Sequence, residues 1–162
     1  MVKAISTRQV LMVLGVLVFG LSAGSGCVAR RGGGNDPKTR LQDYISLSFS
    51  VASPEDREAL SRFLIGPAKT RLAAWSDDQF RAAFLANKRQ FVNLVFSEVK
   101  TVSPREVNIT YELTYLDQSK GHDAKVTHRK QAEMKQDQNQ WYITEVRNLK
   151  ELIEYKNEMA LP

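Results

Sequence analysis

The sequence predicts an α+β fold, in which N-terminal helices pack on a curved antiparallel sheet of about four strands and a further helix follows at the C-terminus. Apolar residues recur at helical spacing between residues 39 and 90, and the period becomes two from residue 91. The strand-like segments are joined by short connections, which suit antiparallel pairing. The 162 residues, 43% apolar and 25% charged, are enough for one packed domain of ordinary size.

Four stretches of the first half predict helices. Residues 39–50 carry apolar side chains at helical spacing. The segment Ser53-Pro54-Glu55-Asp56 supplies a cap, a proline for the first helical position and two acids, and we expect that helix to end at Gly66-Pro67. A short helix is expected over 68–75, and the spacing of Ser76 and Gln79 predicts a capping box that opens another.

The second half predicts four strands. Residues 91–102 are rich in valine and phenylalanine, residues 105–116 alternate most clearly, and residues 124–136 alternate less cleanly. In the last strand Trp141 and Ile143 share a face, while Val146 is out of step, which indicates a β-bulge. The parity of Trp141 predicts that this side chain is buried under the helices.

A final helix is predicted over residues 148–159. Leu149, Leu152 and Ile153 would lie on one side of it. Such a helix would cover one end of the sheet or serve as a contact surface.

The first residues have the pattern of a secretory signal. Lys3 and Arg8 precede an apolar stretch that begins at Val10, and small residues lead to Cys27. No charged residue occurs between Gln9 and Ala29. This pattern predicts export across a membrane.

The end of this signal, Gly24-Ser25-Gly26-Cys27, resembles the lipobox of bacterial lipoproteins. The resemblance implies that residues 1–26 are a signal peptide cut before Cys27, that its thiol receives diacylglycerol, and that the new amino terminus is acylated with a fatty acid such as palmitate. Gly24 departs from the pattern, which usually has leucine or another apolar residue there. Three alternatives are a buried structural cysteine, cleavage by the ordinary signal peptidase, and an uncut membrane anchor.

Residues 27–37 form a flexible tether, and residues 38–162 form the single domain. Arg30 and Arg31 would lie against lipid head groups, where each adds about 1 kcal/mol of attraction to an anionic surface. A glycine run and Pro37 follow. In lipoproteins an aspartate directly after the cysteine can retain the protein at the inner membrane. Val28 stands there, so the resemblance favours the outer membrane, with the domain in the periplasm.

Composition excludes several kinds of site. A single cysteine excludes an intramolecular disulfide, and one cysteine with two histidines excludes a Cys/His zinc cage. Without Lys3 and Arg8 the 23 basic residues fall to 21 against 18 acidic ones, a net charge of +3 that does not indicate a nucleic-acid partner. No phosphate loop or hydrolase motif is present, so we expect no metal, no cofactor and no enzyme activity.

The order of elements over residues 38–147, with the closing strand Trp141-Tyr142-Ile143, resembles the nuclear-transport-factor-like or cystatin-like fold of many small bacterial envelope lipoproteins. Curved sheets of this fold commonly enclose a cavity. His128 and Lys130 share the apolar side of their strand, where they would either line such a cavity or lie in solvent past the helices.

The strand parities define one candidate pocket. Its lining would be Tyr111, Leu113 and Tyr115 on one strand, with Val126 and His128 on the next. The alternative is a filled core, in which the tyrosines pack against Phe80 and Phe84 and their hydroxyls reach the rim.

These observations favour a lipid-anchored, periplasm-facing envelope protein that binds a protein partner or a small apolar ligand without catalysis. One alternative is a membrane-anchored structural subunit of a secretion or envelope complex. Another is an isomerase or dehydratase-type enzyme, whose chemistry needs an acid or base that faces an apolar pocket. Glu112, the carboxylate in the middle of the most clearly alternating strand, lies on its polar face.

Overall fold

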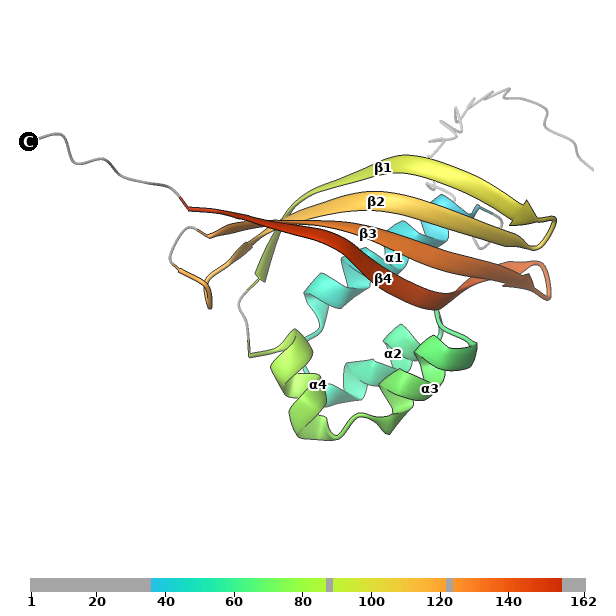
Figure 1. Ribbon diagram of the computed structural model, residues 1–162. Coiled ribbons are helices and arrows are strands. Elements are labelled where there is room, and N and C mark those ends of the chain that lie inside the picture. Colours follow the sequence, from blue (N-terminus) through green and yellow to red (C-terminus); the bar gives the residue numbers. More distant parts are fainter. Residues whose placement is uncertain (1–35, 87–88, 122–123, 156–162) are drawn as a thin grey trace, which may run out of the picture.

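The computed structural model describes residues 36–86, 89–121 and 124–155, and it has two layers (Figure 1). The helical layer comprises α1 (Pro37–Ser50), the 3-10 helix η1 (Pro54–Asp56), α2 (Arg57–Ser61), α3 (Gly66–Ala74) and α4 (Asp77–Phe84). The sheet comprises β1 (Arg89–Ser103), β2 (Glu106–Asp117), β3 (Lys125–Asp137) and β4 (Gln140–Glu154). The signal peptide predicted over 1–26, Cys27 and most of the tether lie outside the described residues.

The sheet is an antiparallel meander with strand order β1-β2-β3-β4, so the predicted α+β fold class is confirmed. β2 pairs with β3 without a register shift, and Tyr111 lies opposite Lys130. The β3–β4 turn places Gln138 and Asn139 at φ 45° and 65°, as a tight two-residue hairpin requires. These strands twist together into a curved sheet (Figure 1).

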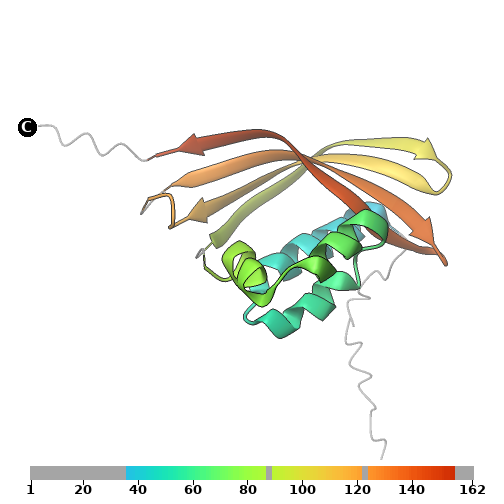
Figure 2. The ribbon, with the colours of Figure 1, turned by 60° about the horizontal axis from the view of Figure 1, so that its bottom comes forward.

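The helices cover one face of the sheet (Figure 2). α1 begins where the Asp36 carboxylate accepts a hydrogen bond from the Thr39 backbone N–H (2.9 Å), and it buries Leu41 and Ile45. The inner sides of β2, β3 and β4 supply the opposing core side chains. That core includes Ile109, Val126, Ala132, Met134, Trp141 and Ile143.

The second predicted helix is shorter than expected, because α2 ends at Ser61 and Gly66-Pro67 begin α3. The intervening segment pairs with β4: Ile143 N–H donates to the Phe63 carbonyl (2.9 Å), and Ile65 N–H donates to the Ile143 carbonyl (3.1 Å). Gly66 then adopts φ +55°, which glycine permits. The pairing with a sheet strand therefore overrides the continuous helix that the apolar spacing predicted.

The predicted helix over 148–159 is wrong over the residues that the structure describes. Residues 148–154 continue β4, with Ile153 opposite Val126 and Glu151 opposite His128. The first half of β3 would otherwise have unpaired backbone groups on this side. A register shift at Leu149 interrupts the alternation of inward and outward side chains, so the sequence of this segment lacks the pattern of a regular strand.

Trp141 is buried, as its parity predicted, with 7% of its surface exposed. The predicted bulge is confirmed as well: Ile143 lies opposite Met134 and Glu145 opposite Glu133, so Thr144 is the extra residue. The bulge returns Val146 to the inner face of β4.

Candidate functional site

A partly open cavity of about 420 Å³ lies between the inner face of the sheet and the helical layer. Helix α1, the end of α3 and helix α4 form one wall, and the sheet forms the other. The helical wall consists of Tyr44, Ile45, Ser48, Phe49, Trp75, Ala83 and Phe84, and the sheet wall of Arg89, Tyr111, Leu113, Tyr115, Lys130 and Val146.

Aromatic contacts hold this lining in place. The ring of Phe49 lies between those of Phe91 and Tyr115, with centroid distances of 5.7 and 5.8 Å and edge-on geometry. Trp75 and Phe84 are in contact at 6.2 Å across the helical wall. Burial raises the pKa of Tyr111, so its phenol stays neutral at physiological pH and can donate a hydrogen bond. The cavity lining therefore combines aromatic and aliphatic side chains with several polar groups.

The structure places three of the five predicted pocket residues on the wall: Tyr111, Leu113 and Tyr115. Val126 and His128 are buried but do not belong to the lining. Val126 lies opposite Ile153 of β4, which packs against the core. The residues of β4 that pair with this end of β3 are ones that the sequence predicted to form a helix.

Among the wall residues that the pocket prediction missed, Lys130 lies nearest in sequence to the predicted ones on β3. It shares the inward parity of His128 and lies opposite Tyr111, so the alternation that found Tyr111 also pointed to it. Its charge made a solvated position the simpler expectation. Only the covering of this part of β3 by the helices makes it part of the cavity.

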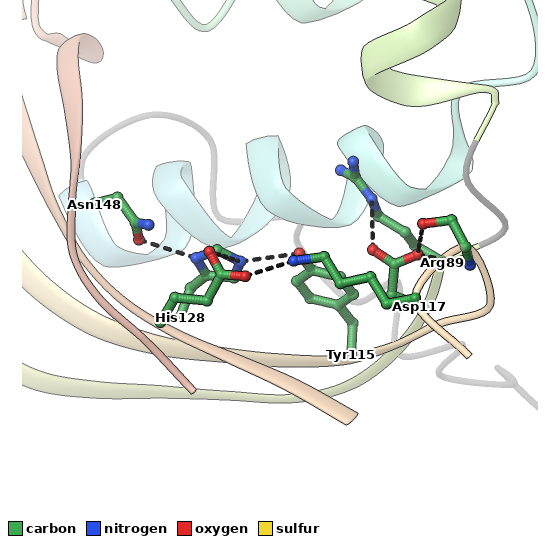
Figure 3. Close-up of polar contacts among 8 residues, drawn as sticks. Arg89, Tyr115, Asp117, His128 and Asn148 are labelled. Carbon is green, nitrogen blue, oxygen red and sulfur yellow. Dashed lines mark hydrogen bonds and ion pairs between the residues drawn. The ribbon is translucent and has the colours of Figure 1, made fainter. Parts of the chain in front are cut away.

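His128 belongs to a polar cluster at the end of the cavity wall (Figure 3). Its Nδ1 lies 2.9 Å from Asn148 Oδ1, and because that oxygen only accepts, Nδ1 is the donor. In the neutral imidazole Nε2 then accepts from the Tyr115 hydroxyl, 3.0 Å away. The ring of Tyr115 therefore lines the cavity, and the hydroxyl of Tyr115 contacts His128.

Two ion pairs complete the cluster. Lys120 Nζ donates to Glu151 Oε1 at 2.6 Å, and this hydrogen bond holds the pKa of the Glu151 carboxyl below its usual value. Arg89 Nε lies 4.0 Å from the buried Asp117 carboxylate (Figure 3). Arg89 and Glu151 are thus each matched by an opposite charge.

Lys130 differs from these groups because it forms no ion pair with any carboxylate among the described residues. Burial lowers the pKa of its ammonium group, and the nearby Arg89 lowers it further, whereas Glu151 acts in the opposite direction. The sheet wall of the cavity therefore carries a half-buried positive charge.

The described part of the chain has neither a metal-binding cluster nor a membrane-spanning helix. No group of three or more His, Cys, Asp or Glu side chains is arranged there to hold a metal ion. None of the helices described is both long and apolar enough to cross a membrane.

Fold and cavity together define an α+β domain in which helices and a four-stranded antiparallel sheet surround a cavity lined by aromatic, aliphatic and polar side chains. No protein-family model matches the chain, and no curated protein sequence matches it. Among solved structures, it is similar to the crystal structure of the intermembrane space region of the chloroplast protein ARC6. The two share 18% sequence identity over 70% of this chain and 96% of that chain, with a TM-score of 0.48.

Proposed function

We propose that this protein is a lipid-anchored envelope protein whose domain faces the periplasm and binds a small apolar ligand without catalysing a reaction. The observation that carries the proposal is the cavity of about 420 Å³ and the aromatic and aliphatic side chains in its lining. Small-molecule sites typically have volumes of roughly 300–1,000 Å³, with apolar walls and a few placed polar groups.

The lipid anchor rests on the export signal and on Cys27 at its end. The tether over 27–37 leads directly into α1, which begins at Pro37. Arg30 and Arg31 would add electrostatic attraction to an anionic membrane surface. Val28 after the cysteine supports the outer membrane, and helices followed by a four-stranded meander support the nuclear-transport-factor-like or cystatin-like fold.

An apolar ligand accounts for the cavity better than incomplete packing does. Side chains that face an empty cavity lose dispersion contacts that a well-packed core would supply. Fully buried residues such as Leu41 and Phe80 show that the neighbouring core is closed. A ligand of matching shape would restore contacts to Phe49, Trp75 and Phe84.

The neutral fluorophore N-phenyl-1-naphthylamine tests this proposal on the processed chain over 27–162, which keeps every described helix and strand. We expect saturable binding with increased fluorescence. Ala83 lines the cavity, and Ala83→Phe should fill it and weaken binding at least about tenfold. Ala82 is exposed on the same helix, so Ala82→Phe is the matched control and should bind as the wild type does. Equal binding by both variants, or no saturable binding by the wild type, would contradict the proposal.

Binding of a protein partner is a second candidate function, favoured by the edge strand β1. Its exposed apolar side chains are Phe91, Val92, Val95, Val99 and Val102. An edge strand with apolar side chains can pair with an added strand. A photo-reactive amino acid at Val95 should then form one discrete adduct in cells, and the same group at the exposed Lys69 of α3 should not. Identical labelling at both positions would exclude β1 as the partner site.

A further inference from the structure

The charge on the cavity wall indicates which apolar ligand the cavity takes. Lys130 lies on the inner face of β3, opposite Tyr111 on β2 and Asn148 on β4. It therefore projects from a central strand of the sheet and lines the cavity together with Tyr111 and Tyr115. The hydrogen-bonded register of three strands fixes its position.

The other charged groups near Lys130 are already matched. Arg89, also on the wall, has Asp117 at 4.0 Å, and Asp117 in turn accepts from the Ser119 hydroxyl at 2.6 Å. Glu151 is bound to Lys120 at 2.6 Å and lies 3.9 Å from His128 Nε2. Lys130 forms none of the ion pairs found among the described residues, so the wall has an excess of one positive charge.

Such a charge is unfavourable in the free protein. Lys130 is partly buried and has no carboxylate partner among the described residues, so its ammonium group loses part of its hydration without a counter-charge to replace it. Burial lowers its pKa, which is the signature of this cost. A negative group inside the cavity would supply the missing counter-charge, and the neutral phenol of Tyr111 beside it can donate a further hydrogen bond.

We infer that the ligand is an organic anion, with an apolar body held by the aromatic wall and a single acidic group neutralised by Lys130. The aromatic side chains Phe49, Trp75 and Phe84 would contact the body. One acidic group matches the one unmatched cation. This inference rests on the proposed binding function and adds the chemical class of the ligand.

Two fluorophores that differ by one charged group test it on the processed chain. 1-Anilinonaphthalene-8-sulfonate has the same aromatic body as N-phenyl-1-naphthylamine and carries one sulfonate. We expect the wild type to bind the sulfonate probe about tenfold more tightly than the neutral probe at low ionic strength, the usual size of one charge-assisted hydrogen bond. Lys130→Met should abolish this preference, so that the affinities for the two probes come within about twofold of each other.

Matched variants identify the charge that matters. Lys125 lies on the same strand but is exposed and paired with Glu154, so Lys125→Met should keep the preference for the sulfonate probe. Lys130→Arg should also keep it, because the positive charge remains. As a measurement that needs no variant, dodecanoate should displace the neutral probe from the wild type at a concentration about tenfold below that of 1-dodecanol.

The outcomes separate the two proposals. If the neutral probe binds and Ala83→Phe excludes it, but Lys130→Met leaves the ratio of the two affinities unchanged, the cavity binds ligands and the inferred anion is wrong. Sulfonate binding that persists in Ala83→Phe would place that probe outside the cavity and would also overturn the inference. If neither probe binds in a saturable way, the binding function itself fails.

Discussion

The imidazole of His128 lies nearly parallel to the phenol ring of Tyr115, with an interplanar angle of 6° and ring centroids 5.7 Å apart. The Tyr115 hydroxyl oxygen is 3.0 Å from His128 Nε2. The two residues are diagonal neighbours, because Tyr115 pairs with Val126 and His128 with Leu113. This contact joins the cavity wall to the polar cluster, so His128 can affect a bound ligand only by positioning Tyr115.

Tyr115→Phe should lower the free energy of unfolding by about 1–2 kcal/mol, because it leaves the buried Nε2 of His128 without its phenol partner. Urea denaturation at pH 7 measures this loss. Tyr142→Phe is the control: among the described residues its hydroxyl hydrogen-bonds only to Gln140, two residues away at the β3–β4 turn, and we expect a change within about 0.5 kcal/mol. Equal losses in the two variants would show that the Tyr115–His128 contact contributes nothing specific.

Lys130→Met should stabilise the ligand-free protein by about 1 kcal/mol at pH 7, because it replaces an unpaired half-buried cation with an apolar side chain. The pKa of Lys130 is lowered in the folded state, so the folded chain binds fewer protons than the unfolded chain between that value and the ordinary 10.5. Wild-type stability should therefore rise with pH in this window, and the advantage of the variant should shrink.

Urea melts at pH 7 and pH 10 compare the wild type, Lys130→Met and the control Lys125→Met. Lys125 is exposed and paired with Glu154, so its replacement should give no gain at either pH. A loss of stability in Lys130→Met at pH 7 would mean that the ammonium group is satisfied in the free protein.

Trp141→Ala should cost roughly 3–5 kcal/mol, the usual range for deletion of a large buried aromatic side chain. The ring is packed in the core, and the Trp141 backbone carbonyl accepts a hydrogen bond from Arg40 Nε (3.2 Å) that the substitution does not remove. Chemical denaturation gives the value, and Trp141→Phe should recover most of the stability. A loss below about 1 kcal/mol would contradict the packing of β4 against the helices.

Arg71→Gln should make the protein more sensitive to acid. Arg71 Nη2 donates to both carboxylate oxygens of Glu145, at 2.8 and 2.7 Å, and holds the pKa of that carboxyl below its usual value. This stabilisation is complete above the ordinary pKa near 4.5 and is lost as the pH falls through the lowered value. Without Arg71 this contribution is absent, so the less stable variant should unfold at a higher pH during acidification.

Circular dichroism during acid titration should therefore show a midpoint at higher pH for Arg71→Gln than for the wild type. Arg62→Gln serves as the control, because its pair with Glu58 spans one exposed helix turn, with 71% and 80% of the side-chain surfaces exposed. That variant should keep the wild-type midpoint. A common midpoint for all three proteins would show that the Arg71–Glu145 pair does not link α3 to β4 energetically.

Cys27→Ser tests the lipid anchor, which lies outside the described residues. The substitution removes the chain's only thiol, so an unprocessed precursor should accumulate and labelling with a fatty-acid analogue should be lost. Ser25→Ala keeps a small residue in the lipobox-like segment and should be labelled like the wild type. Equal labelling of wild type and Cys27→Ser would exclude Cys27 as the attachment site, and an unlabelled wild type would favour the membrane-anchored structural subunit.

Local chemistry determined the elements that the sequence predicted well. Ser76 and Gln79 form both hydrogen bonds of the capping box, at 2.8 and 3.2 Å, so the start of α4 depends on residues within one turn. The strict alternation over β2 determined which side chains face inward and therefore placed Tyr111 and Tyr115 on the wall. Such signals suffice where a segment's own pattern agrees with its surroundings.

Only the tertiary structure decided the remainder. Residues 148–154 have the spacing of an amphipathic helix, but they form a strand because the backbone groups of β3 need partners and Ile153 packs opposite Val126. The same strand puts Asn148 beside His128, while the helices cover Lys130 and make it part of the cavity. The sequence by itself determined which residues face the inside of the sheet. Which of them border a cavity depended on long-range pairing and helix packing, because these contacts join residues far apart in the chain.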